Sequence, residues 1–265
     1  MPSRALLASL LTLLTMATSA CQAPPAAPAQ GSDLDRIVGA KVVRVCSTGD
    51  YRPFTYRDPQ GRWSGLDVDL AHDLATRLGV RLDLVPTTWS SLMRDLDDHC
   101  DLAMGGITIT LDRAKKARFS TPYLRDGKAA AVRCADAARY RSLADVDRTE
   151  VRVVVNPGGT NADFDHATLK NATIVEYPDN DTIFEQLVQG RADVMITDAS
   201  EVRWQTARNP LLCGVAVDHP FTFSQKAYLV PRADVMLQQW IDQWLNLITN
   251  DGTFAAVSQR WLGTG

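Results

Sequence analysis

Strands and helices alternate along almost the whole chain, and this alternation constrains the fold more than any other feature of the sequence. Short apolar runs such as 42–46 and 151–155 have the length and the β-branched content of buried strands. Amphipathic stretches lie between such runs. In 67–78, apolar side chains share one helical face and Gly79 follows as a stop. Successive βαβ units form mostly parallel sheets covered by helices, so the sequence predicts an α/β fold.

The other predicted elements continue this pattern. We expect Ser90, Thr110 and Asn180 to cap helices, because their side-chain oxygens can accept from the first free backbone N–H groups. The helix after Thr110 is expected to run through Ala117. The remaining strands are expected at 80–85, 101–104, 172–177, 192–196 and 227–230, and the last two helices around 237–248 and 254–261.

Two stretches of the chain, 100–108 and 191–198, resemble each other. In each, an Asp precedes an apolar strand, and a polar residue stands at the carboxyl end of that strand. Ligands of open α/β sheets bind beyond the carboxyl ends of the strands. Two such units therefore indicate two lobes whose strand ends face one another, with a ligand between them.

The N-terminus has the pattern of a signal peptide over residues 1–20. Arg4 precedes an apolar run, 5–16, which is too short to span a bilayer, and small residues follow at 18–20. We therefore expect an exported, periplasmic protein. Cys21 and an Ala/Pro-rich segment come next, and we assign 21–31 to a flexible linker. Two alternatives remain open: a lipidated Cys21 that tethers the protein to a membrane, or ordinary signal cleavage.

Composition and motifs exclude several classes of function. The chain has 28 Lys and Arg against 31 Asp and Glu, whereas a nucleic-acid-binding protein is expected to show a basic face. We predict no nucleic-acid partner. The sequence contains no Gly-x-Ser-x-Gly, Walker or His-Glu-x-x-His motif, and no Cys or His spacing typical of zinc. We therefore expect no metal site, and any catalysis has to use carboxylates, hydroxyls or backbone groups.

Four cysteines follow the linker: Cys46, Cys100, Cys134 and Cys213. An oxidising compartment permits disulfides, and four cysteines allow three pairings. Cys134 and Cys213 flank the middle segment of the chain, so their pairing is the favoured hypothesis. The alternative is four buried thiols that pack as small hydrophobic side chains.

Several polar residues at predicted strand ends are candidates for binding an anion. Arg113, just past a strand end, offers a planar fork that matches a carboxylate. The loop Asn156–Asn161, which includes Thr160, joins a strand to a helix N-terminus, where backbone N–H groups favour anions. Each also has a simpler interpretation, as a helix-surface arginine and as a plain turn.

Aromatic and acidic residues complete the candidate site. Tyr51, Phe54, Trp63 and Trp89 lie in predicted loops near strand ends, where they can wall a ligand or simply pack. Asp198 and Glu201 are three residues apart at a strand-to-helix corner. Two carboxylates beside one cleft can differ in pKa, one ionised and one protonated, although acids in a first helical turn also simply suit the helix dipole.

The order of several motifs resembles the family 3 extracellular solute-binding proteins, which bind polar amino acids for ABC transporters. These motifs are 43–54, 65–70, Gly106-Ile107-Thr108 with Arg113, and 119–123. The resemblance implies a two-lobed, type II periplasmic-binding fold with the ligand in the interlobe cleft and a hinge that closes on it. It also implies a first lobe of 32–124 plus 225–265 and a second lobe of 125–224.

A second set of motifs is similar to the cyclohexadienyl dehydratases, enzymes built on the same fold. The motifs are 122–128, 155–161, 178–180, 182–184 and 197–201. These enzymes convert prephenate to phenylpyruvate and arogenate to phenylalanine, with no cofactor. The resemblance implies that Glu201 is the general acid and that Asn156 and Asn161 lie in the pocket. Gly105, Cys46 and Cys100 depart from the family pattern, but none of them is a proposed catalytic group.

The resemblance implies further roles in ligand binding. Arg113 is expected to hold a substrate carboxylate, with Gly106 and Thr108 beside it. Asp198 matches the acid that meets the ligand ammonium in amino-acid binders. Lys128 or Arg125 adds positive charge if it reaches the cleft. Two hypotheses follow: a prephenate/arogenate dehydratase with Glu201 as acid, or an amino-acid receptor of an ABC transporter clamped by Asp198 and Arg113. The sequence leaves open the oligomeric state and the preferred substrate.

Overall fold

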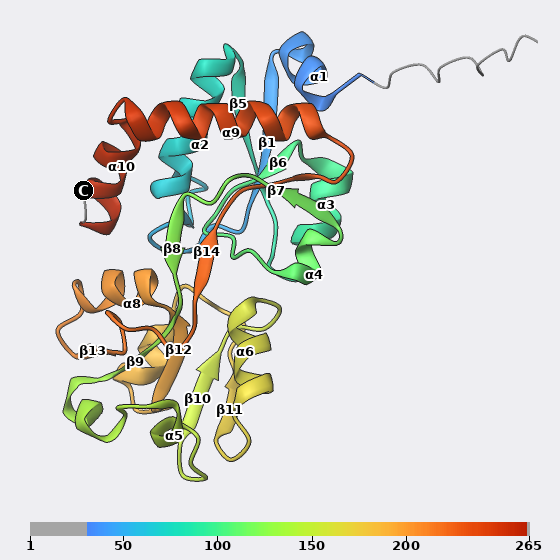
Figure 1. Cartoon of the computed structure of the whole chain (residues 1–265). Coiled ribbons are helices and arrows are strands. Elements are labelled where there is room, and N and C mark those ends of the chain that lie inside the picture. The colour runs from blue at the N-terminus through green and yellow to red at the C-terminus, as the bar shows by residue number, and fades with distance from the viewer. Residues whose placement is uncertain (1–30, 264–265) are drawn as a thin grey trace, which may run out of the picture. The chain divides into compact units, whose positions relative to one another are not determined.

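The computed structural model describes residues 31–263, which form two α/β lobes, one above the other in Figure 1. The predicted signal peptide (1–20), Cys21 and nearly all of the predicted linker (21–31) lie outside the described residues. Within residues 31–263, no helix is both long enough and apolar enough to cross a membrane.

The first lobe is built on a five-stranded sheet in the order β5-β1-β6-β15-β7. Its strands are Val42–Ser47 (β1), Arg81–Pro86 (β5), Leu102–Ala103 (β6), Ala117–Phe119 (β7) and Leu229–Pro231 (β15). Strands β5, β1 and β6 are parallel, whereas β15 pairs antiparallel with β6 and β7. A small antiparallel ribbon follows β1 and consists of Asp50–Tyr51 (β2), Thr55–Arg57 (β3) and Trp63–Ser64 (β4).

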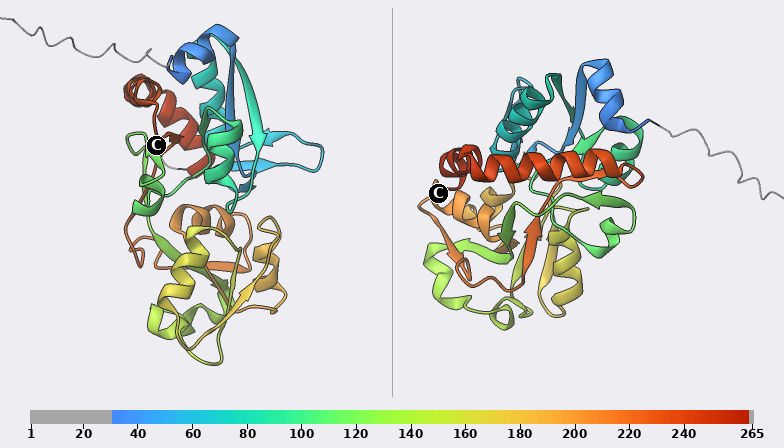
Figure 2. Two further views of the ribbon diagram at one scale, coloured as in Figure 1. Left: turned by 90° about the vertical axis from the view of Figure 1, so that its right-hand side faces the viewer. Right: turned by 45° about the horizontal axis from the view of Figure 1, so that its top comes forward.

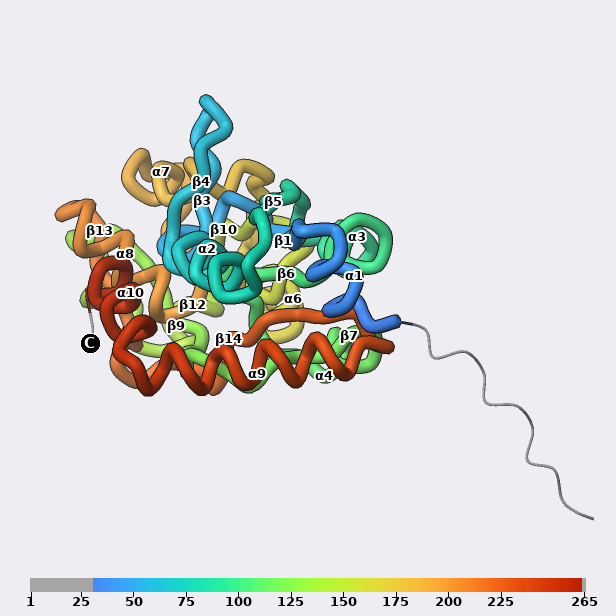
Figure 3. The backbone as a smooth tube through the Cα atoms, turned by 90° about the horizontal axis from the view of Figure 1, so that it is seen from above, coloured from blue at the N-terminus to red at the C-terminus, as the bar shows by residue number. Residues whose placement is uncertain are grey.

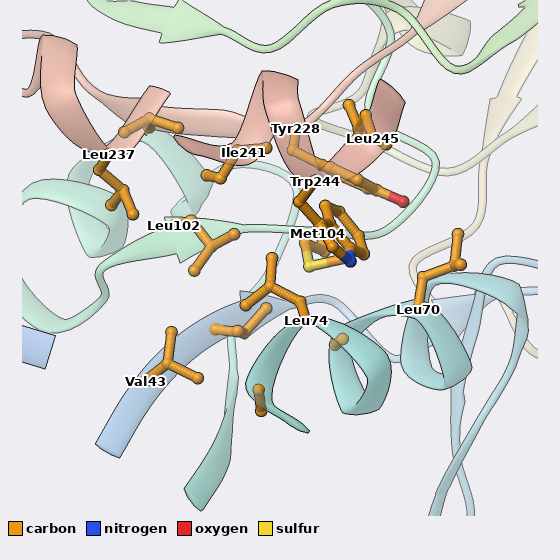
Figure 4. Close-up of a cluster of buried hydrophobic side chains, with 14 of the residues drawn as sticks. Val43, Leu70, Leu74, Leu102, Met104, Tyr228, Leu237, Ile241, Trp244 and Leu245 are labelled. Carbon is orange, nitrogen blue, oxygen red and sulfur yellow. The ribbon is translucent and has the colours of Figure 1, made fainter. Parts of the chain in front are cut away.

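Helices cover this sheet and supply most of its core. They are Asp33–Ala40 (α1), Leu66–Leu78 (α2), Leu92–His99 (α3), Leu111–Ala114 (α4), Val235–Asn250 (α9) and Thr253–Leu262 (α10). Seen from above, α9 lies along one side of the lobe and the β2–β4 ribbon projects on the opposite side (Figure 3). Side chains of α9 and α2, including Ile241, Trp244 and Leu74, meet Leu102 and Met104 in the core (Figure 4).

The second lobe has a sheet of the same plan, in the order β11-β10-β12-β9-β13. Its strands are Lys128–Arg133 (β9), Arg152–Val155 (β10), Thr173–Glu176 (β11), Val194–Asp198 (β12) and Leu212–Val215 (β13). Its helices are Cys134–Arg139 (η1, a 3₁₀ helix), Leu143–Val146 (α5), Thr160–Thr168 (α6), Ile183–Val188 (α7) and Ala199–Thr206 (α8). Buried alanines and valines of β9, β10 and β12 form the centre of this lobe.

The lobes are joined by two crossing segments, Leu124–Asp126 (β8) and Ser224–Lys226 (β14), which pair antiparallel and are visible between the lobes in Figures 1 and 2. The chain leaves β8 directly into β9 of the second lobe, and leaves β14 into β15 of the first. Each returning strand, β9 or β15, therefore runs opposite to the other four strands of its sheet. The sheets are mixed for this reason, although four of the five strands in each run in the same direction, in line with the mostly parallel sheets that the alternation predicts.

Three local predictions are wrong. The helix after Thr110 ends at Ala114, because Ala117 enters β7 and pairs with Pro231. Ser90 does not cap α3, whose N-cap is Ser91 without a side-chain bond. Asn180 does not cap α7 either; its Nδ2 donates to the backbone oxygen of Asp50 in the other lobe, at 2.8 Å. Thr110 does cap α4, accepting from the Arg113 N–H.

All four cysteines of the described residues form disulfides. Cys134 and Cys213 join η1 to β13 in the second lobe, which confirms the favoured pairing. Cys46 of β1 is bonded to Cys100 at the end of α3 in the first lobe. The alternative of four free thiols is therefore wrong. The two cysteines that depart from the family pattern bond to each other.

Candidate active site

A cavity lies between the lobes, and the structure brings all nine predicted ligand-binding residues to its wall. The first lobe contributes Tyr51, Trp89, Gly106, Thr108 and Arg113, and the second contributes Asn156, Thr160, Asn161 and Asp198. Gly159, which belongs to the predicted loop Asn156–Asn161, and Asn180, which was expected only to cap a helix, complete the lining. Most of these residues follow a strand end or begin a helix, as expected for a site beyond the carboxyl ends of strands.

Gly106 sits at a closely packed point in the cavity wall of the first lobe. Its φ is +63°, and a Cβ added there lies 2.6 Å from the ring of Phe54 and 2.7 Å from the ring of Tyr51. Both the conformation and the close approach favour glycine. The Gly106 N–H donates to Asp67, which also accepts from the hydroxyls of Tyr123 and Tyr228 at 2.8 and 2.9 Å. Burial raises the pKa of Asp67 to about 6, although its three donors act in the opposite direction.

Arg113 lies in α4 beside the cavity, with its Nη1 donating to the backbone oxygen of Thr108 at 2.9 Å. None of residues 31–263 provides a carboxylate within ion-pair distance of its guanidinium. Burial lowers the pKa of Arg113 while the charges of Asp163 and Asp198 raise it, and an arginine stays charged at any physiological pH. The cavity wall therefore holds an uncompensated planar cation that fits a ligand carboxylate.

Asp198, at the end of β12, is held by two lysines. Lys128 Nζ donates to its Oδ1 at 2.9 Å, and both Lys226 Nζ and the Tyr51 hydroxyl donate to its Oδ2. Burial by itself would raise the pKa of Asp198, but the two ammonium groups outweigh it and hold that pKa well below the usual range. Asp198 is thus an ionised carboxylate whose two oxygens are already engaged.

Lys226 is the residue that sequence reasoning missed. It is fully buried at the end of β14, and its Nζ also donates to Thr108 Oγ1 at 2.9 Å. The only signal in the sequence is a lysine immediately before the apolar run 227–230. Lys128 does reach the site. Burial lowers the pKa of its ammonium group, and the negative charge of Asp198 acts in the opposite direction. Arg125 does not reach the site. It is exposed, and its guanidinium carbon lies 5.0 Å from the ring centroid of Phe223.

Glu201 lies in the first turn of α8, just behind the cavity lining, and is 1% exposed. Its Oε2 accepts from Thr197 Oγ1 at 2.6 Å, and Thr197 Oγ1 accepts from Asn161 Nδ2 at 2.9 Å. Burial raises the pKa of Glu201 to about 8, and the charges of Asp198 and Asp50 act in the same direction. Two acids three residues apart therefore differ in state: Asp198 is ionised, and Glu201 is protonated at neutral pH.

The aromatic candidates divide between the cavity and the ribbon. Tyr51 and Trp89 line the cavity, with ring centroids 5.5 Å apart in an edge-on arrangement. Phe54 stacks against Tyr51 at 5.1 Å from behind the wall. Trp63 lies in β4 of the ribbon under Arg57 and is not among the lining residues. Within residues 31–263, no cluster of His, Cys, Asp and Glu has the arrangement of a metal site.

Comparisons with known proteins agree with this architecture. Residues 43–264 match the family described as bacterial extracellular solute-binding proteins, family 3. A cyclohexadienyl dehydratase of Pseudomonas aeruginosa is 49% identical over 235 residues, which cover 88% of this chain and 87% of that protein.

Two solved structures of ancestral proteins are also similar. An ancestral amino acid-binding protein, described as a precursor of cyclohexadienyl dehydratase, is 33% identical with a TM-score of 0.81, covering 87% of this chain and all of the other. An ancestral cyclohexadienyl dehydratase is 47% identical with a TM-score of 0.56, covering 88% of this chain and 97% of the other.

Proposed function

The chain belongs to the bacterial extracellular solute-binding proteins of family 3, and we propose that within this family it is an enzyme, a cyclohexadienyl dehydratase. It converts prephenate to phenylpyruvate and arogenate to phenylalanine. The relative of the same activity that is 49% identical supports this proposal at the level of the whole chain. The site supports it in two ways. Asp198 and Glu201 differ in protonation state, and the side chains of Arg113, Lys128 and Lys226 supply positive charge.

The observation that carries the proposal is the buried Glu201 just behind the cavity lining, whose pKa burial raises to about 8. In the reaction, Glu201 gives its proton to the leaving ring hydroxyl, and the C–O bond breaks to release water. The bond between the ring and its carboxylate breaks at the same stage, its electron pair completes the aromatic ring, and carbon dioxide leaves. Glu201 is left as a carboxylate and regains a proton from solvent. A positioned acid typically contributes 10²–10⁴-fold to such a step.

Burial of Glu201 makes this acid available at neutral pH. An ordinary glutamate is almost wholly ionised there, whereas a pKa of about 8 leaves Glu201 mostly protonated. Its Oε2 is occupied by the Thr197 hydroxyl, and its Oε1 has no hydrogen-bond partner among residues 31–263. Oε1 is therefore the atom assigned to proton donation.

The cations of the site suit a substrate with two carboxylates. Arg113 holds one carboxylate through its fork, and Thr108 and Gly106 lie beside it on the same wall. Lys128 and Lys226 together carry one more charge than Asp198 neutralises. This leaves a positive field at the wall of the second lobe, where Asn156, Thr160 and Asn161 offer neutral polar groups.

The state of Asp198 weighs against the receptor hypothesis. An amino-acid receptor clamped by Asp198 and Arg113 uses the negative charge of Asp198 to pair with the ligand ammonium. Here Lys128 occupies Oδ1, and Lys226 and Tyr51 occupy Oδ2. The protein's own ammonium groups thus take the positions that such a ligand would fill.

We further propose that the enzyme works outside the cytoplasm. Residues 1–20 have the pattern of an export signal, and the matched family is extracellular. We retain the proposed lobes of 32–124 plus 225–265 and of 125–224, whose sheets the two crossovers join. Lipidation of Cys21 stays a separate proposal, which mass spectrometry of the exported protein tests.

The proposed function is tested by turnover. Purified mature protein is mixed with prephenate or arogenate at neutral pH, and phenylpyruvate or phenylalanine is followed against an enzyme-free control. The proposal predicts turnover of prephenate well above the spontaneous rate. A folded protein that shows no turnover, but whose melting temperature rises with an L-amino acid, is a receptor instead.

A further inference from the structure

Lys128 lies at the start of a chain of hydrogen bonds that leads to Glu201. It is the first residue of β9 and is 5% exposed. Its Nζ donates to Thr160 Oγ1 at 3.1 Å, to Asp198 Oδ1 at 2.9 Å and to Asn161 Oδ1. An ammonium group has three donors and no acceptor, so these three bonds use it completely.

This contact fixes the orientation of the Asn161 amide. A flipped amide would place its NH₂ group against the ammonium of Lys128, donor against donor. The oxygen of Asn161 therefore faces Lys128, and Nδ2 faces the second lobe's β12, where it donates to Thr197 Oγ1 at 2.9 Å. A residue that accepted as well as donated at position 128 would permit both orientations.

The orientation of Asn161 in turn fixes the hydroxyl of Thr197. Because Thr197 Oγ1 accepts from Asn161, its own proton needs an acceptor elsewhere. Glu201 Oε2, at 2.6 Å, is the acceptor that residues 31–263 offer. Thr197 is fully buried, so water does not replace this partner without a cost. The bond makes Oε2 an acceptor, and the acid proton of Glu201 then belongs on Oε1.

We propose that Lys128 is a positioning residue for proton transfer: through Asn161 and Thr197 it keeps the acid proton of Glu201 on Oε1, the oxygen without a partner in the protein. The proposal rests on the proposed function, in which Glu201 is the general acid. Without Lys128, the Asn161 amide is free to flip and to accept from the Thr197 hydroxyl, whose oxygen can then accept the proton of Glu201. The proton then has a second position on Oε2, turned away from the substrate.

Lys226 offers a matched control for this role. It also donates to Asp198 and carries the same charge, but its other partners are Thr108 and Tyr51, with no bond to Asn161. Replacing either lysine by methionine removes one buried positive charge from the same carboxylate. Only the replacement of Lys128 breaks the path to Glu201.

The test is a double-mutant cycle between Lys128→Met and Thr197→Val, with kcat and KM measured for prephenate. Each single substitution is expected to lower kcat by about tenfold or more with a smaller change in KM. In the Thr197→Val background, Lys128→Met is expected to lower kcat by a further factor of less than about two, because the hydrogen-bond chain to Glu201 is already broken. Thr197→Ser, which keeps the hydroxyl, restores both the rate and the effect of Lys128→Met.

The effects of Lys226→Met and Thr197→Val on kcat are expected to multiply, because these residues act on different groups. If the effects of Lys128→Met and Thr197→Val on kcat also multiply, or if Lys128→Met changes KM alone, Lys128 acts by charge or by packing and the proposal is overturned. Lys128→Gln, which can accept as well as donate, replaces the methionine variant if that variant fails to fold. Circular dichroism and thermal melting establish folding for every protein in the cycle.

A second measurement separates this proposal from the proposed function. The titration of the Glu201 carboxyl is followed by ¹³C NMR without substrate, in the same four proteins. Lys128→Met is expected to move this titration in the native background but not in the Thr197→Val background. Equal shifts in both backgrounds overturn the positioning role, whereas absence of prephenate turnover in the native protein refutes only the proposed function.

Discussion

The pH dependence of turnover gives a quantitative test of the acid assigned to Glu201. Burial raises the pKa of this carboxyl from 4.5 to about 8. A group of that pKa is protonated in about nine-tenths of the molecules at pH 7, against roughly one in three hundred for an ordinary glutamate. The buried site thus increases the acid form about 300-fold at neutral pH.

Because the protonated form is the active one, kcat/KM for prephenate is expected to be flat between about pH 6 and 7. It falls to half near pH 8 and then about tenfold per pH unit. The assay follows phenylpyruvate at each pH and subtracts the rate without enzyme. Thr197→Val removes a hydrogen bond that lowers the pKa of Glu201, so the falling limb is expected to move to higher pH in that variant. A limb that falls near pH 5, or one that Thr197→Val leaves in place, refutes the assignment.

Three further predictions follow from particular contacts. Arg113→Gln removes the only unpaired guanidinium on the described wall of the cavity, and kcat/KM for prephenate is expected to drop about 10- to 150-fold, mostly through KM. Asp165 is fully buried with no partner for either oxygen among the described residues, and burial raises its pKa to about 8, so stability is expected to decrease as the pH rises from about 4 to 8. Asp165→Asn is expected to make this decrease smaller in thermal melts, and a decrease of the same size contradicts the prediction. Removal of the Cys134–Cys213 disulfide by double alanine substitution is expected to cost about 2–4 kcal/mol of unfolding free energy in urea titrations, and an unchanged value contradicts a structural role.

The cavity wall was largely predictable because its residues follow strands. Gly106, Thr108, Asn156 and Asp198 stand just after or at the end of apolar runs, and the geometry of α/β sheets brings such ends together. The position of Glu201 behind that wall follows from its place in the first turn of α8, three residues after Asp198. For these residues, the local sequence and the fold class are enough to predict their place in the site.

What the sequence did not predict depends on pairs that are distant along the chain. Lys226 is 28 residues from Asp198 and Lys128 is 70 residues away, so nothing local indicates that three charges meet in one buried cluster. The same holds for the early end of α4, because Ala117 is drawn into β7 by its pairing with Pro231. In each case tertiary contacts override the local preference.

The central claim, that Glu201 donates the proton in a dehydratase, is tested most directly by Glu201→Gln. The amide keeps the size and the hydrogen bond to Thr197 but has no acidic proton to give. Binding of prephenate to the folded variant is measured by calorimetry, and turnover is measured in the same preparation. We expect near-native affinity with a rate at least about 10²-fold lower. A variant that binds prephenate and turns it over at the native rate contradicts it.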